Sequence, residues 1–80
     1  MSKLPTDVRG EEAIKAFETF GFVLVRERGS HKILKKDGHR FLLSVPCHKG
    51  ECLGQGLLRS LIRAADVSVS DFLAALTSTR

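Results

Sequence analysis

The sequence predicts an α+β fold in which helices cover one face of a three-stranded antiparallel sheet. Two segments, near the two ends of the chain, have apolar residues at helical spacing. The segment between them is rich in β-branched and aromatic residues and is broken by glycine turns. The expected order is therefore helix, three strands, helix and a short last helix. Residues 1–80 should form one domain, because so short a chain has no room for a second core.

The N-terminal part of the chain predicts an arm followed by an amphipathic helix. Residues 1–9 have no clear periodicity, and we expect them to form a loose arm. From Gly10 onward, apolar residues recur every three or four positions opposite charged ones. Glu11 and Glu12 in the first turn suit the positive end of a helix dipole, and Gly21 is a natural helix stop.

The middle of the chain predicts a meander of three short strands. Residues 22–25 form a β-rich run, and Gly29 and Ser30 then break the chain before a second strand over residues 31–35. An Asp-Gly pair at residues 37–38 predicts a hairpin turn into a third strand, residues 41–45, which a proline ends. Alternation places His31 with Ile33 and Lys35, but both faces of this strand are mixed. The pattern therefore does not decide which face carries the histidine.

The C-terminal part predicts two more helices. Gly56 precedes a stripe of leucine, isoleucine and alanine that continues to Ala65, with arginines on the opposite side. Ser68, followed three residues later by Asp71, resembles a capping box that opens a short last helix.

The positive charge is concentrated in the strand segment. The whole chain has a formal net charge of +4, whereas residues 22–50 hold seven basic residues against two acidic ones, a net charge of +5. Such a patch favours a polyanion such as RNA or DNA. A solvated strand edge, whose lysines discourage aggregation, would give the same composition.

His31 is the candidate acid-base group. It follows the tight Gly29-Ser30 turn, where a glycine lets the backbone or a ligand come close. An imidazole exchanges protons near neutral pH, as general acid-base cleavage of a phosphodiester requires. The sequence has no carboxylate pair, glycine-rich phosphate loop or Ser/His/Asp set.

The ordered set of these short motifs resembles the HicA (YcfA-like) mRNA interferase toxins. The matching stretches are Gly21-Phe22, Gly29-Ser30-His31, Val45-Pro46, His48-Lys49-Gly50, residues 56–63, Val67-Ser68 and Asp71-Phe72-Leu73. The resemblance implies a fold similar to the double-stranded-RNA-binding domain and an RNA-cleaving activity that depends on His31. It also implies neutralisation by a HicB-type antitoxin. The chain departs from the pattern at Asp66, where relatives often have glycine, and at Cys47 and Cys52.

The candidate RNA-binding residues surround the histidine in the sequence. They are Arg28, Gly29, Ser30, Lys32, Lys35, Lys36 and Lys49. His48 is a possible second site residue, which either contacts phosphate, assists His31 or only ties down its loop. Four residues separate Cys47 from Cys52, a wider spacing than paired zinc ligands usually have, so we expect reduced thiols and neither a metal nor a cofactor.

Three classes of function agree with these observations. The first is a metal-independent endoribonuclease that cleaves mRNA as the toxin of a toxin-antitoxin pair. The second is a non-catalytic RNA-binding module of the same fold, which would need lysines at phosphates but no imidazole at a turn. The third is a subunit that only binds a protein partner. No segment is apolar enough to span a membrane or to serve as a signal peptide, so we expect the chain in the cytoplasm.

Overall fold

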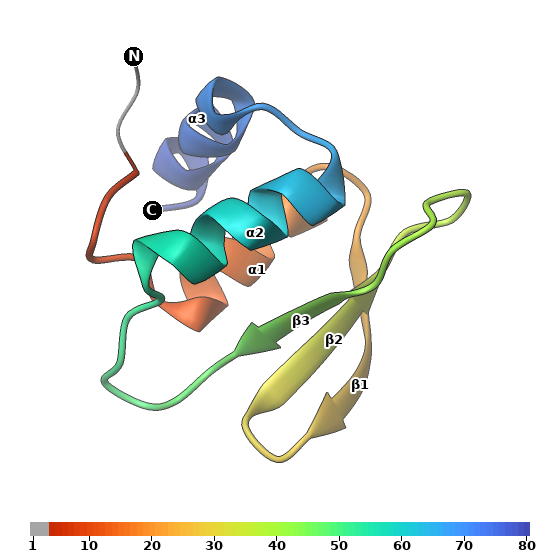
Figure 1. Ribbon diagram of the computed structural model, residues 1–80, viewed down its shortest axis with the longest axis horizontal. Helices are drawn as coiled ribbons and strands as arrows, with labels where there is room; N and C mark the ends of the chain where they lie inside the picture. Colours follow the sequence, from red (N-terminus) through yellow and green to blue (C-terminus); the bar gives the residue numbers. More distant parts are fainter. Residues whose placement is uncertain (1–3) are drawn as a thin grey trace.

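The elements follow the predicted order along the chain (Figure 1). The computed structural model describes residues 4–80. Helix α1 spans Gly10–Glu18, and the strands are β1 (Val23–Arg28), β2 (His31–Lys35) and β3 (Leu43–Pro46). Helices α2 (Gln55–Ala65) and α3 (Val69–Thr79) complete the α+β fold. Helix α3 has 11 residues, as many as α2, so it is longer than the short last helix expected from its cap.

The three strands form one antiparallel sheet in the order β1-β2-β3. Only Gly29 and Ser30 separate β1 from β2, and Arg28 pairs with His31 across this turn. Gly29 has a φ of 60°, a value that glycine adopts without the steric cost of a side chain. The β1–β2 register shifts between Leu24 and Arg26, which places a bulge at Val25.

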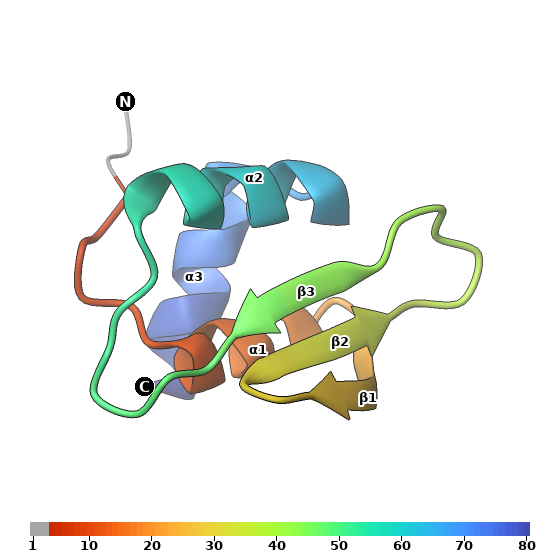
Figure 2. The ribbon, with the colours of Figure 1, turned by 60° about the horizontal axis from the view of Figure 1, so that its bottom comes forward.

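All three helices lie on the same side of the sheet (Figure 2). Alternate strand residues Leu34, Leu43 and Val45 are fully buried against them, as the period of two requires. The core continues into the helices through Phe17, Leu58 and Phe72. Because the helices cover one face of the sheet, the other face is open.

The start of α3 and the end of α2 are capped in different ways. Ser68 Oγ accepts a hydrogen bond of 3.0 Å from the backbone N–H of Asp71, so the predicted cap of α3 is formed. At the end of α2, Asp66 adopts the left-handed conformation with a φ of 60°. A non-glycine residue thus fills the position where glycine is usual.

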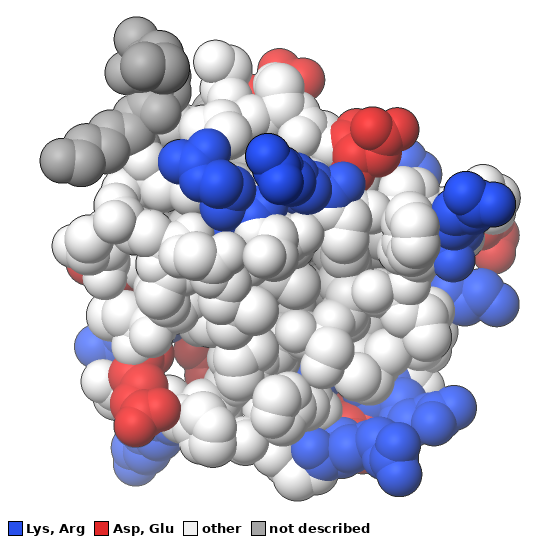
Figure 3. All heavy atoms as spheres, in the orientation of Figure 1, with Lys and Arg blue, Asp and Glu red and all other residues white. Residues whose placement is uncertain are grey.

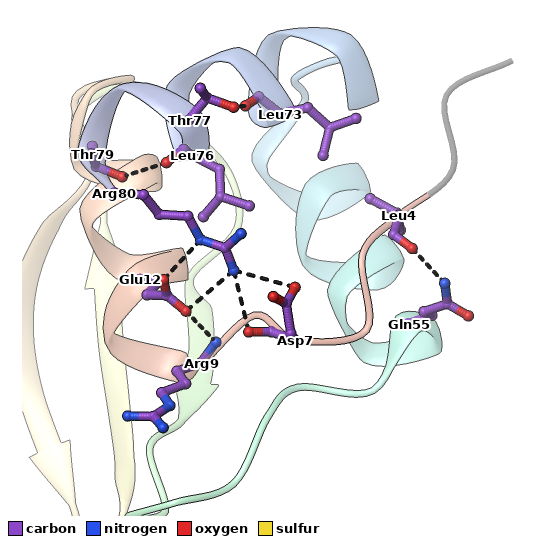
Figure 4. Close-up of polar contacts among 10 residues, drawn as sticks. All are labelled: Leu4, Asp7, Arg9, Glu12, Gln55, Leu73, Leu76, Thr77, Thr79 and Arg80. Atoms are coloured by element: carbon purple, nitrogen blue, oxygen red, sulfur yellow. Dashed lines mark hydrogen bonds and ion pairs between the residues drawn. The ribbon is translucent and has the colours of Figure 1, made fainter.

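Residues 4–9 are anchored, which differs from the expected loose arm; residues 1–3 lie outside the described residues. Leu4 and Val8 are buried in the core, and the carbonyl of Val8 accepts a 2.7 Å hydrogen bond from the N–H of Leu53. The side-chain amide of Gln55 donates to the Leu4 carbonyl (Figure 4). The pattern failed here because two apolar residues in an irregular segment have no period, yet both are buried in the core.

Arg80 ties the end of the chain to the start of α1 (Figure 4). Its Nε donates to Glu12 at 2.8 Å, and its Nη2 donates to the Asp7 carboxylate at 3.3 Å. Glu12 also accepts a hydrogen bond from the backbone N–H of Arg9. The hydrogen bond from Arg80, and then that from Arg9, lower the pKa of Glu12 below its usual value.

Within residues 4–80, none of the helices has both the length and the apolar character that crossing a bilayer requires.

Candidate functional site

The open face of the sheet, turned away from the helices, is defined by the strand register. Residues directly opposite each other in an antiparallel pair point to the same side. Leu34 is buried under the helices. His31, Ile33 and Lys35 each lie an odd number of positions from Leu34 along β2, so they point to the opposite side of the sheet. The open face therefore carries Val23, Arg26, Arg28, His31, Ile33, Lys35, Ser44 and Pro46.

His31 is the first residue of β2 and its side chain is exposed on this face. Its Nδ1 lies 3.3 Å from Ser44 Oγ on β3. If the ring donates its Nδ1 proton to Ser44, Nε2 is left with a lone pair and can accept a proton. If Ser44 donates to Nδ1 instead, Nε2 carries a proton and can give it away. Either arrangement orients the ring and leaves Nε2 for another partner.

Of the described residues, three cations and no carboxylate share the open face with His31. Arg28 lies directly opposite His31, Arg26 lies opposite Ile33, and Lys35 lies two positions beyond Ile33 on β2. None of the three forms an ion pair with a carboxylate within residues 4–80. Figure 3 shows Lys and Arg side chains gathered where the sheet lies, at the lower right of that view. The local field therefore favours an anion beside the imidazole.

The other predicted RNA-binding lysines are placed elsewhere. Lys32 points to the helix side of the sheet, where its Nζ lies 3.7 Å from Glu27. Lys36 follows β2, and its Nζ lies 5.8 Å from the ring centroid of Phe22. Lys49 is exposed in the loop after β3. The structure thus places Arg28 and Lys35 on the same face of the sheet as His31, but not Lys32 or Lys36.

The loop after β3 is fastened to the Gly29-Ser30 turn. The backbone N–H of Cys47 donates to the Ser30 carbonyl at 2.7 Å, and His48 Nε2 lies 3.1 Å from Ser30 Oγ. His48 is exposed. Its bond to Ser30 is the contact that a loop-tying role requires, and it also holds a second imidazole beside the turn that begins at Gly29.

The cavity beside His48 is too small to hold a nucleotide. Its volume is about 80 Å³, and it is lined by Pro46, His48, Glu51, Cys52, Leu53, Gly54 and Leu57. Ligand pockets usually enclose about 300–1,000 Å³. A polymeric ligand would therefore not enter this cavity.

The third histidine, His39, is not part of this site. Its Nε2 lies 2.6 Å from the Ala64 carbonyl oxygen at the end of α2, and its ring packs edge-on against Phe22 at 5.2 Å between centroids. The residue thus fastens the β2–β3 loop to α2.

The two cysteines are free thiols with different surroundings. Cys47 is half-buried, and burial raises the pKa of its thiol, whereas Cys52 is exposed. Among residues 4–80, the structure has no group of three or more His, Cys, Asp or Glu side chains placed to hold a metal ion.

A family profile described as the HicA toxin of bacterial toxin-antitoxin matches residues 10–67, well over half of the chain. The chain belongs to the HicA toxin family. No curated protein matches the chain. As a HicA toxin it is one component of a toxin-antitoxin system, which implies an antitoxin partner, and toxins of this family are generally of the ribonuclease type.

Sequence reasoning missed two side chains of the HicA open face, Arg26 and Ser44. A two-residue turn sets Arg28 opposite His31, so alternation back along β1 could have placed Arg26 on the same face. Ser44 could not be found in this way, because its diagonal contact with His31 depends on the β2–β3 register across a loop of seven residues, 36–42.

Proposed function

We propose that this HicA toxin is a metal-independent endoribonuclease that cleaves mRNA in the cytoplasm and is neutralised by a HicB-type antitoxin. The observation that carries the proposal is the position of His31. It stands exposed on a helix-free face, its Nδ1 is within hydrogen-bond distance of Ser44, and Arg28 lies directly opposite. An oriented imidazole beside unpaired cations is the minimum set for acid-base attack on a phosphodiester.

In the proposed mechanism, His31 acts through Nε2 as the general base. It removes the proton from an RNA 2′-hydroxyl, and the resulting oxygen attacks the adjacent phosphorus. The bond from phosphorus to the 5′ oxygen breaks, leaving a 2′,3′-cyclic phosphate and a 5′-hydroxyl that takes up a proton. Arg26, Arg28 and Lys35 would stabilise the charge that develops on the phosphoryl oxygens. DNA lacks the nucleophile and would not be cut.

His48 is the candidate source of the leaving-group proton, and its contact with Ser30 supports a positioning role equally well. The pH dependence of cleavage distinguishes the proton-donating role of His48 from the positioning role. If a single base and no general acid takes part in cleavage, the rate should rise with pH and reach a plateau. A bell-shaped profile that His48→Ala converts to a plateau would assign His48 as the acid.

The decisive experiment compares wild-type protein with His31→Ala on RNA, on DNA of the same sequence, and in EDTA. We expect wild-type cleavage of RNA alone, unaffected by the chelator, and a loss of about 10²-fold or more in His31→Ala. RNA affinity should change little, because ground-state binding comes from the cations. Growth of bacteria expressing the wild-type chain, the variant or an empty vector gives the matching test of toxicity.

Three outcomes contradict the mechanism. A folded His31→Ala protein that still cuts RNA would move the base elsewhere, with His48 the next candidate. A variant that fails to fold, judged by its melting temperature, would assign His31 a structural role. Loss of wild-type cleavage in EDTA, restored by added metal, would overturn metal independence.

The second candidate function is a non-catalytic RNA-binding module, which the same cationic open face favours. It predicts salt-sensitive RNA binding without cleavage, because phosphate contacts release counterions. Wild-type protein that binds RNA but produces no cyclic-phosphate ends would select this alternative.

A further inference from the structure

Strand β1 has an exposed apolar half that RNA does not account for. Val23, Leu24 and Val25 are 57%, 43% and 52% exposed. All six residues of the strand are exposed, and the strand lies at the edge of the sheet, where β2 is its only pairing partner within residues 4–80. Figures 1 and 2 show it as the strand furthest from α2. Aliphatic side chains neither pair with phosphate nor stack on bases, so this half of β1 needs another partner.

We propose that β1 is the docking edge for the antitoxin, which adds an extended segment of alternating aliphatic and acidic residues to the sheet. The free backbone groups of an edge strand accept such an addition, and alternate side chains provide specificity. The proposal rests on the toxin assignment above and names the partner surface of the same protein.

The charges of β1 decide between an acidic partner and a second copy. Its other half is Arg26-Glu27-Arg28, and Glu27 lies 3.7 Å from Lys32 of β2. Two β1 strands paired edge to edge would set four arginines against two glutamates, and these glutamates already have cationic neighbours. Like charges across a strand pair are destabilising, whereas acidic side chains on an incoming strand would meet Arg26 and Arg28 directly.

Docking at β1 would also block the proposed chemistry. Arg26 and Arg28 lie on the open face, and Arg28 is directly opposite His31. Carboxylates that pair with these arginines would occupy the positions that RNA phosphates need. Antitoxin and RNA would then compete for the same two cations, even though the antitoxin draws its apolar contacts from residues 23–25.

The first test measures the affinity of the full-length cognate antitoxin for Val25→Lys and for a matched control, Leu42→Lys. Leu42 is 58% exposed in the β2–β3 loop, so both changes place a lysine at a similarly exposed apolar site. We expect at least about a tenfold loss of affinity for Val25→Lys and less than about twofold for Leu42→Lys. Equal affinities for wild type and Val25→Lys, or equal losses in both variants, would overturn the proposal.

The second test uses wild-type protein, so a misfolded variant cannot obscure it. Strand addition gives the outward-facing N–H groups of residues 23–28 hydrogen-bond partners, and their hydrogen exchange should slow at least tenfold in the antitoxin complex. Unchanged exchange across β1, with protection elsewhere, would overturn the proposal. A free wild-type dimer in sedimentation that Val25→Lys converts to monomer would assign the edge to a second copy instead.

RNA cleavage distinguishes failure of this proposal from failure of the nuclease assignment. Val25→Lys should cut RNA like wild type and escape inhibition by the antitoxin. If neither protein cuts RNA, the nuclease assignment fails, while a loss of antitoxin affinity still supports docking at β1. If both cut RNA and the antitoxin inhibits both equally, docking at β1 fails alone.

Discussion

Removal of the Ser44 hydroxyl should slow RNA cleavage modestly without unfolding the protein. Ser44→Ala deletes the partner that lies 3.3 Å from His31 Nδ1 on an exposed face. A single neutral hydrogen bond contributes about 0.5–1.5 kcal/mol net, and a long, exposed one belongs at the lower end. Since about 1.4 kcal/mol is a tenfold change in rate, we expect kcat to fall by roughly 2- to 10-fold. KM should stay the same, because the cations that bind RNA are untouched.

Single-turnover cleavage of a short RNA measures this effect. Ser44→Thr keeps the hydroxyl in a strand-compatible residue and should restore most of the rate. Ser60→Ala is the matched control, because Ser60 is an exposed serine on α2 whose hydroxyl donates to the Gly56 carbonyl at 3.1 Å. An unchanged rate in Ser44→Ala would show that His31 is oriented by other contacts. A loss above about 10²-fold would place Ser44 among the groups that touch the reacting atoms.

Three further predictions concern stability. Gly10→Ala would put a methyl group 2.6 Å from Cys47 Sγ, so the free energy of unfolding measured in urea should fall by about 1–3 kcal/mol. An unchanged unfolding midpoint would mean that α1 shifts freely to make room. Asp66→Gly removes a non-glycine residue from the left-handed region, so the free energy of unfolding should rise by about 0.5–1 kcal/mol. A decrease would show that the Asp66 side chain stabilises the cap. Arg80→Ala removes the hydrogen bond that lowers the pKa of Glu12, a stabilisation present above the carboxyl pKa of the unfolded chain and lost as the pH falls through the folded value. The melting temperature of the variant should therefore lie below that of wild type at pH 7 and converge with it once the pH falls below the lowered, folded-state pKa of Glu12. A gap independent of pH would refute the linkage.

The order of helices and strands was predictable because its signals are local. The apolar stripe from Gly10, the break at Gly29-Ser30 and the Ser68 cap each depend on residues within one or two turns of each other, and each element was found in the structure. Boundaries were less well predicted. Strand β1 runs to Arg28 and not to Val25, because its charged half pairs with β2 although its own composition is not β-rich.

The candidate site was only partly predictable, because its residues belong to three strands. Proximity in sequence to His31 suggested Lys32 and Lys36, but alternation turns Lys32 away, and Lys36 lies beyond the end of β2. Arg26 and Ser44 reach the open face through strand pairing. Whether the residues of this face bind RNA stays a prediction.

By itself, the sequence determined the element order, the concentration of positive charge in the strands and the candidate histidine, since periodicity, composition and turn chemistry act over a few neighbouring residues. Only the tertiary structure decided which side of the sheet is free. Both faces of β2 contain apolar and charged residues, so the choice depended on where the helices found buried partners. Leu34, Leu43 and Val45 pack under those helices, and because side chains alternate along a strand, this packing leaves His31 exposed on the other face.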